Sequence, residues 1–126
     1  MKRILLVVLV LALGAACSGG SSDETTVKLA EGQRFDPESL EVAVGTTVRF
    51  VNDSAEGHTV TAYDGAPQYF ASGRFESEDE ARDNLADGMI GQESSYEVTF
   101  DEPGTYDYFC IPHEQQGMRG TIVVTE

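Results

Sequence analysis

The stretch SYEVTFDEPGTYDYFCIPHEQQGM, residues 95–118, decides the fold. Apolar and polar residues alternate in its first part, DEPG at 101–104 has the composition of a turn, and the alternation then resumes. A side-chain period of two is typical of β-strands with one buried face. Tyr106, Tyr108 and Cys110 share one face of the second strand, which predicts that the Cys110 sulfur points into the core.

Further strands are expected at 40–44, 46–52, 58–62 and 120–126, where apolar residues recur at every second position. Short strands separated by turn signals indicate an all-β sandwich. The segment ESEDEARDNLADG at 76–88 breaks this pattern, because Ser77 and Glu80 have capping-box spacing and Gly88 stands where a helix would end. We therefore expect one short inserted helix, with its dense acidic side chains facing solvent.

The N-terminal residues 1–17 have the features of a signal peptide. Two basic residues precede an apolar run at 4–13, which is too short to cross a bilayer as a helix. Small residues then lead to Cys17 in a pattern resembling a lipoprotein lipobox, although Leu13 stands one position further back than usual. We expect export with Cys17 as the lipid anchor. Ordinary cleavage nearby and an uncleaved signal anchor are the alternatives.

Residues 18–26, SGGSSDETT, are small and polar, which predicts a flexible linker to a domain at 27–126. The signal segment carries two of the eight basic residues and no acid, so the exported part holds six basic and 22 acidic residues, a formal charge of −16. This balance excludes nucleic acid as a partner, because phosphate binding requires Lys and Arg.

Cys110, His113 and Met118 fall within nine positions, and His58 lies on the inward face of its expected strand. A buried imidazole needs a partner, because leaving it unpaired costs about 1–3 kcal/mol. Structural zinc sites prefer four Cys or His ligands, whereas two His, one Cys and a long axial Met suit copper in both oxidation states. The alternatives are a free core thiol at Cys110, a satisfied core His58, a solvent-facing His113 and a core-filling Met118.

Two segments resemble a known family. CIPHEQQGM at 110–118 resembles the copper loop Cys-x2-His-x4-Met of plastocyanins and pseudoazurins, and FDPESLEVAVGTTVRFVN at 35–52 resembles the segment before their first His ligand. The likeness extends over residues 25–126. The acidic composition, the inserted helix and the lipobox-like start look most like halocyanins, the lipid-anchored blue copper proteins of salt-loving archaea.

The resemblance implies a cupredoxin fold, which is a Greek-key β-sandwich of about seven to eight strands. It also implies a one-electron carrier with one copper ion, held by His58, Cys110, His113 and Met118. The expected partners are a redox donor and acceptor, such as a cytochrome or a membrane respiratory complex. We expect a monomer at the outer face of the cell membrane, or a soluble extracellular or periplasmic protein. Catalysis is not expected, because protein groups take all four ligand positions. Copper delivery or storage and a metal-free sandwich are the alternative functions.

The sequence departs from the family pattern beside the first ligand. Plastocyanins usually carry Asn after that His, and here the position is Thr59, whose hydroxyl could tie the ligand loops together. The Thr59 N–H can point at the thiolate, whereas Pro112 has no N–H to offer the sulfur, which predicts a lower potential. An apolar rim around His113 is expected to contact partners. Its members are Ile111, Pro112, Gly117 and Pro67.

Overall fold

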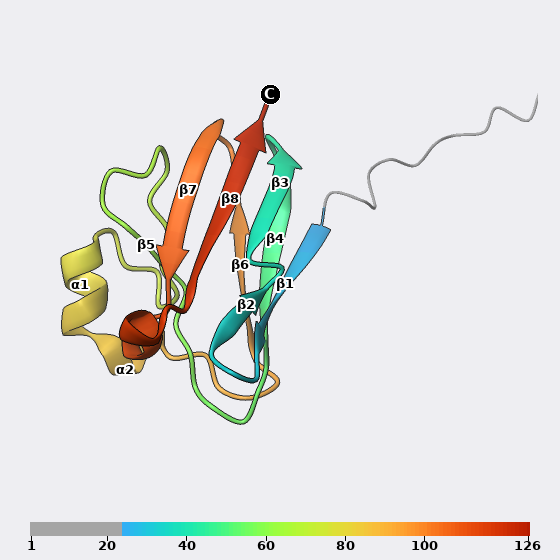
Figure 1. Ribbon diagram of the computed structural model, residues 1–126. Coiled ribbons are helices and arrows are strands. Elements are labelled where there is room, and N and C mark those ends of the chain that lie inside the picture. The colour runs from blue at the N-terminus through green and yellow to red at the C-terminus, as the bar shows by residue number, and fades with distance from the viewer. Residues whose placement is uncertain (1–23) are drawn as a thin grey trace, which may run out of the picture.

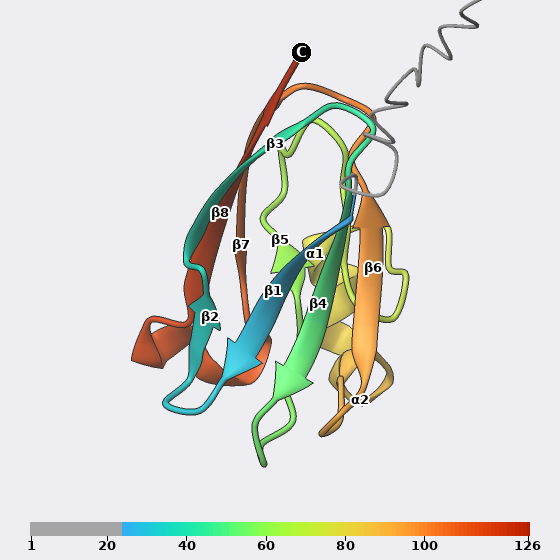
Figure 2. The same cartoon turned by 90° about the vertical axis from the view of Figure 1, so that its right-hand side faces the viewer.

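The structure, a computed structural model, describes residues 24–126 and consists of two facing four-stranded sheets (Figures 1 and 2). The first sheet has the order β2-β1-β4-β6, formed by β1 (Glu24–Ala30), β2 (Arg34–Asp36), β4 (Thr47–Asp53) and β6 (Ser95–Thr99). The second has the order β3-β8-β7-β5, formed by β3 (Ser39–Ala43), β5 (Thr61–Ala62), β7 (Gly104–Phe109) and β8 (Arg119–Thr125). The prediction of a β-sandwich with seven to eight strands is confirmed.

Strand pairing places distant parts of the chain side by side. β1 pairs in parallel with β4 and β3 in parallel with β8, whereas the other neighbouring strands are antiparallel. Each strand from β2 to β7 lies in a different sheet from the strand that follows or precedes it within this range, so the chain crosses repeatedly over the ends of the sandwich. The loops that carry functional side chains therefore come together at one end although they are far apart in sequence.

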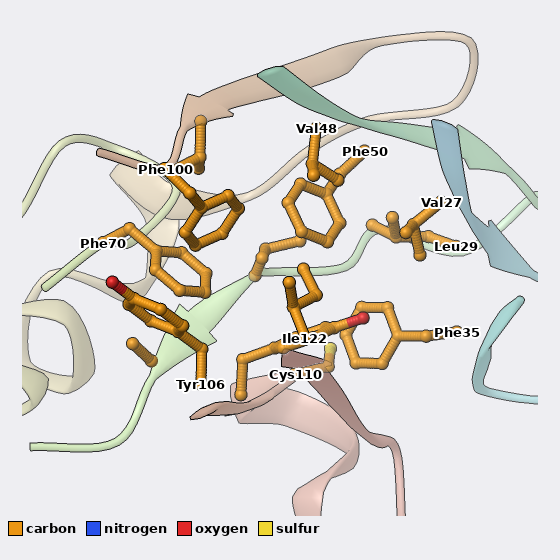
Figure 3. Packing of buried hydrophobic residues seen from close by; sticks show 14 of the residues in the cluster. Val27, Leu29, Phe35, Val48, Phe50, Phe70, Phe100, Tyr106, Cys110 and Ile122 are labelled. Atoms are coloured by element: carbon orange, nitrogen blue, oxygen red, sulfur yellow. The ribbon is translucent and has the colours of Figure 1, made fainter. Parts of the chain in front are cut away.

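The predicted alternation places the core between the sheets. Val48 and Phe50 of β4 are fully buried and Arg49 between them is exposed. Figure 3 shows Cys110 at the edge of this core, near Phe35 and Ile122. Burying a large apolar side chain contributes about 1.5–3 kcal/mol, so these residues hold the two sheets together and fix the start of the loop after Cys110.

The predicted strand at 58–62 is shorter in the structure, where only Thr61 and Ala62 form β5. His58 makes an isolated antiparallel bridge with Ile90, with N–O distances of 3.2 and 2.7 Å. Thr59 is also buried, so the polar side of this stretch does not face water as a period of two would require. The Thr59 hydroxyl instead meets the segment after Cys110, where the Ile111 N–H donates to it at 2.8 Å.

The predicted single helix at 76–88 is two helices, α1 (Glu78–Asp83) and α2 (Leu85–Gly88). Its start is confirmed, because the Ser77 hydroxyl accepts a hydrogen bond from the Glu80 N–H at 3.1 Å. The helix breaks at Asn84, which has φ −122° and ψ 41° and whose side chain donates to the Glu80 carbonyl at 2.9 Å. Asn side chains compete with the backbone in this way, which explains the break.

The predicted linker at 18–26 overlaps β1, which begins at Glu24 and includes residues 24–26. Val27 and Leu29 are buried with Lys28 exposed between them, and the whole of β1 pairs with β4. The signal peptide at 1–17, with Cys17, and the rest of the linker lie outside the described residues. Among the residues from Glu24 onward, no helix has the length and apolar character needed to cross a membrane.

Candidate metal centre

Three of the four predicted ligands meet at one end of the sandwich. His58 lies in the loop between β4 and β5, Cys110 follows β7 directly, and His113 lies in the 3₁₀ segment η2 (Ile111–Gln116). One donor atom from each lies within 4.8 Å of the other two. His58 and Cys110 are fully buried, and the His113 side chain is 12% exposed. The centre is therefore closed, with one imidazole at its edge.

The distances between these donors suit a single metal ion. His58 Nδ1 lies 3.7 Å and His113 Nδ1 3.4 Å from the Cys110 Sγ, and the two Nδ1 atoms are 3.1 Å apart. Two donors that each lie about 2 Å from one metal ion are about 3–4 Å from each other. Two imidazoles and a thiol at this spacing form the trigonal donor set that suits copper.

Hydrogen bonds orient His58 with Nδ1 toward the sulfur. Its Nε2 lies 2.8 Å from the Ser54 hydroxyl. That hydroxyl donates its own proton to the Asn52 side-chain oxygen at 2.8 Å or to the Glu56 carbonyl at 3.1 Å, so toward His58 it accepts. Nε2 therefore carries the ring proton and Nδ1 keeps a free lone pair. Burial, together with the nearby His113, lowers the His58 pKa, which favours the neutral imidazole that binds metals.

His113 is oriented in the same sense by a carboxylate. Its Nε2 lies 3.1 Å from Glu56 Oε2, which also accepts a hydrogen bond from the Gln33 amide at 3.2 Å. An ionised carboxylate only accepts, so the His113 ring proton lies on Nε2. The Nδ1 atoms of His58 and His113 then face each other at 3.1 Å, each with a free lone pair. A cation bound by both lone pairs would stabilise this arrangement.

Thr59 makes both of the bonds expected of it. Its backbone N–H donates to the Cys110 sulfur at 3.3 Å, and its hydroxyl accepts from the Ile111 N–H at 2.8 Å. Burial raises the pKa of the Cys110 thiol, and the N–H groups of Thr59 and His113 oppose that shift. The hydroxyl thus ties the two ligand loops together without the Asn common in plastocyanins.

Met118, the fourth predicted ligand, is fully buried at the base of the loop. The Cys110 N–H donates to its carbonyl at 3.0 Å, and its own N–H donates to the His113 carbonyl at 3.2 Å. Gly117 permits this tight closure, because its φ of 86° lies in the left-handed region that favours glycine. The loop is therefore held through the backbones of all three ligands that it carries.

The structure places three of the four residues of the predicted rim around His113, and their contact with partners stays a prediction. Pro112 and Gly117 are exposed and Ile111 is half-buried, all on the loop around His113. Pro67 does not belong to the rim, because it packs against Gly104, at the end of β7 opposite to the ligands. The reason is topological: β5 runs antiparallel to β7, so the chain after β5 leads away from the metal end.

Three residues that support the two imidazoles were not predicted from the sequence: Asn52, Ser54 and Glu56. They stand two residues apart in the polar run that ends at His58. Asn52 is buried, and its amide donates to the Glu56 carbonyl at 2.7 Å and to the Ile90 carbonyl at 2.9 Å. Polar residues at alternate positions before a buried His were the available signal, but a turn has the same composition.

The sandwich and the converging donors define a closed mononuclear centre of the blue copper type. A family model described as copper binding proteins of the plastocyanin/azurin family matches residues 18–125. The chain belongs to this family, and copper is its cofactor. The cupredoxin prediction is thereby confirmed, while the finer resemblance to halocyanins stays a prediction.

Relatives and solved structures agree with this assignment. Plastocyanin of Scenedesmus fuscus is 33% identical over 80% of this chain and 99% of its own length. Amicyanin of Paracoccus denitrificans is 35% identical over 72% of this chain, and the chloroplastic plastocyanin of Physcomitrium patens is 32% identical over 83%. The chain spans less than two thirds of the length of these last two relatives: 58% of the amicyanin and 60% of the chloroplastic plastocyanin. A copper(I) structure of an amicyanin mutant has a TM-score of 0.63 and 31% identity, covering 82% of this chain and 84% of that one.

Proposed function

We propose that this chain is a type 1 copper protein that carries single electrons at the outer face of the cell membrane. The observation that carries the proposal is the closed centre, in which a fully buried Cys110 meets two imidazoles whose free nitrogens point at its sulfur. Relatives named plastocyanin and amicyanin support the electron-carrier role.

Copper bound at this centre supplies one-electron chemistry through its two oxidation states. The chain contributes rigidity, because Ser54 fixes His58, Glu56 fixes His113, and Thr59 joins the two loops. Donors held in this way move little when charge changes, which favours fast electron transfer. With Met118 as the fourth ligand, no position remains for a substrate, so the proposed role is that of a carrier and not of an enzyme.

His113 is the proposed exit for the electron, since it is the one ligand of the three clustered donors that reaches the edge of the protein. Ile111, Pro112 and Gly117 around it form a surface for a redox donor and acceptor, such as a cytochrome or a membrane respiratory complex. Lipid attachment at Cys17 would keep a monomeric carrier next to such partners. A diacylglycerol adduct on Cys17, sought by mass spectrometry of the membrane fraction, tests the anchor, with Cys17→Ser as the control.

The function is tested by loading the protein with Cu(II) and recording its visible spectrum and voltammogram. The carrier predicts an intense blue thiolate-to-copper band, lost in Cys110→Ser, and reversible cycling of one electron per copper. A colourless protein that binds only Cu(I) would show copper delivery or storage instead. Absence of stoichiometric copper after refolding with the metal would refute both.

A further inference from the structure

The inserted helix α1 lies against the ligand loop, as Figure 1 shows where α1 stands beside the helical turn before β8. Arg82 of α1 makes the connection. Its guanidinium Nη1 lies 2.9 Å from Glu114 Oε2, and Nη2 lies 3.5 Å from Glu78 Oε1 on its own helix. Glu114 directly follows the ligand His113 in the chain.

The same guanidinium also covers the residue next to the thiol ligand. The Arg82 Cζ lies 4.6 Å from the centre of the Phe109 ring, and Phe109 is buried immediately before Cys110. Tyr63 stacks on Phe109 at 4.3 Å, and its hydroxyl donates to Glu114 Oε1 at 3.3 Å. One cation therefore contacts the chain neighbours of two ligands, within a small cluster that spans the inserted helix, β7 and the ligand loop.

We propose that Arg82 is a positioning residue for the copper centre, holding the ligand loop in place through Glu114 and Phe109. The proposal rests on the proposed function where it concerns copper release, but the part that concerns the mobility of the loop can be tested in the copper-free protein. An isolated surface ion pair contributes little to stability. Here the planar guanidinium of Arg82 pairs with Glu114 and also lies over the Phe109 ring, a combination that a Lys side chain does not reproduce.

For Arg82, an electrostatic effect on the copper ion and a positioning effect on the ligand loop predict opposite changes in the rate of copper release, so the two can be distinguished. Removing the positive charge of Arg82 would, by electrostatics alone, slow the loss of Cu(II), and neutralising Glu114 would speed it. If the contact positions the loop, both Arg82→Ala and Glu114→Gln release copper faster. We expect an increase of about tenfold, the low end for residues that support metal ligands. The double variant should release copper no faster than either single variant, because each single substitution already removes the same contact between Arg82 and Glu114.

The experiment measures copper release from the Cu(II)-loaded protein to a chelator, and amide hydrogen exchange of residues 111 and 113–117 in the copper-free protein. Arg49→Ala is the matched control, since it also removes a cation from a surface ion pair. Arg49 lies 3.8 Å from Glu97, and both belong to the sheet that does not contain β7 and β8, the strands on either side of the ligand loop. Arg82→Lys keeps the charge and should still release copper faster, which covers the case of an Arg82→Ala variant that fails to fold.

Faster exchange of the loop amides in the Arg82 variants, with Arg49→Ala like the wild type, would support the positioning role. Exchange and release at the rates of the Arg49→Ala control, or slower release from Arg82→Ala, would overturn it. A wild-type protein that binds no copper would refute the proposed function alone, because the exchange measurement in the copper-free chain still decides the role of Arg82.

Discussion

Replacing Thr59 by Val should lower the free energy of unfolding of the copper-free protein by about 1–2 kcal/mol. Val keeps the branched shape of the side chain, which is 1% exposed, and removes only the hydroxyl, which accepts from the Ile111 N–H at 2.8 Å and, over a longer 3.4 Å, from the Thr61 hydroxyl. An unpaired buried N–H costs about 1–3 kcal/mol, and the lower half applies because Ile111 is half-buried and water reaches it in part. The Thr59 N–H bond to Cys110 stays, because it belongs to the backbone.

Urea denaturation followed by circular dichroism measures this change, and an unchanged slope with denaturant would show that only stability has altered. Thr105→Val is the control, since Thr105 is an exposed residue of β7 and surface substitutions stay within about 0.5 kcal/mol. Thr59→Ser should recover most of the loss by restoring the hydroxyl. Equal unfolding free energies for the Thr59 and Thr105 valine variants would refute the claim that this hydroxyl joins the ligand loops.

Two other predictions concern titration and metal affinity. Burial raises the pKa of every tyrosine in the chain: Tyr63, Tyr69, Tyr96, Tyr106 and Tyr108. Tyr96 reaches a pKa of about 12, so ultraviolet titration should show far less tyrosinate at pH 11 in the native protein than in urea, where the pKa is about 10. Because the folded state keeps these protons more tightly, stability should be full below about pH 10 and fall as the pH rises toward 12, and a flat profile there would contradict the burial. Ser54→Ala removes the group that fixes the His58 ring and should weaken copper affinity about 10–100-fold in chelator competition; Ser94→Ala, an exposed serine, is the control, and equal affinities would show that Ser54 does not orient the ligand.

The ligand loop was predictable because its information is local. Cys110, His113 and Met118 are close in the chain, and a period of two placed Cys110 on the buried face of β7. The same period predicted the inward side of β4, confirmed by the burial of Val48 and Phe50. β1 was missed although Val27 and Leu29 alternate with Lys28, because the preceding polar run resembled a linker.

Contacts between loops could not be predicted in the same way. The pairing of Glu56 with His113 and of Arg82 with Glu114 joins segments brought together only by the packing of the two sheets and α1. The error at Pro67 has the same origin, because its distance from the centre depends on the direction of β5 relative to β7.

The sequence by itself determined which strands have a buried face and which donor atoms are available, since side-chain period and ligand chemistry are properties of neighbouring residues. The tertiary structure alone decided which nitrogen each imidazole presents and which side chains hold it there. Those choices depend on hydrogen bonds such as that from His58 to Ser54 and from His113 to Glu56, whose geometry arises only once the sheets have packed.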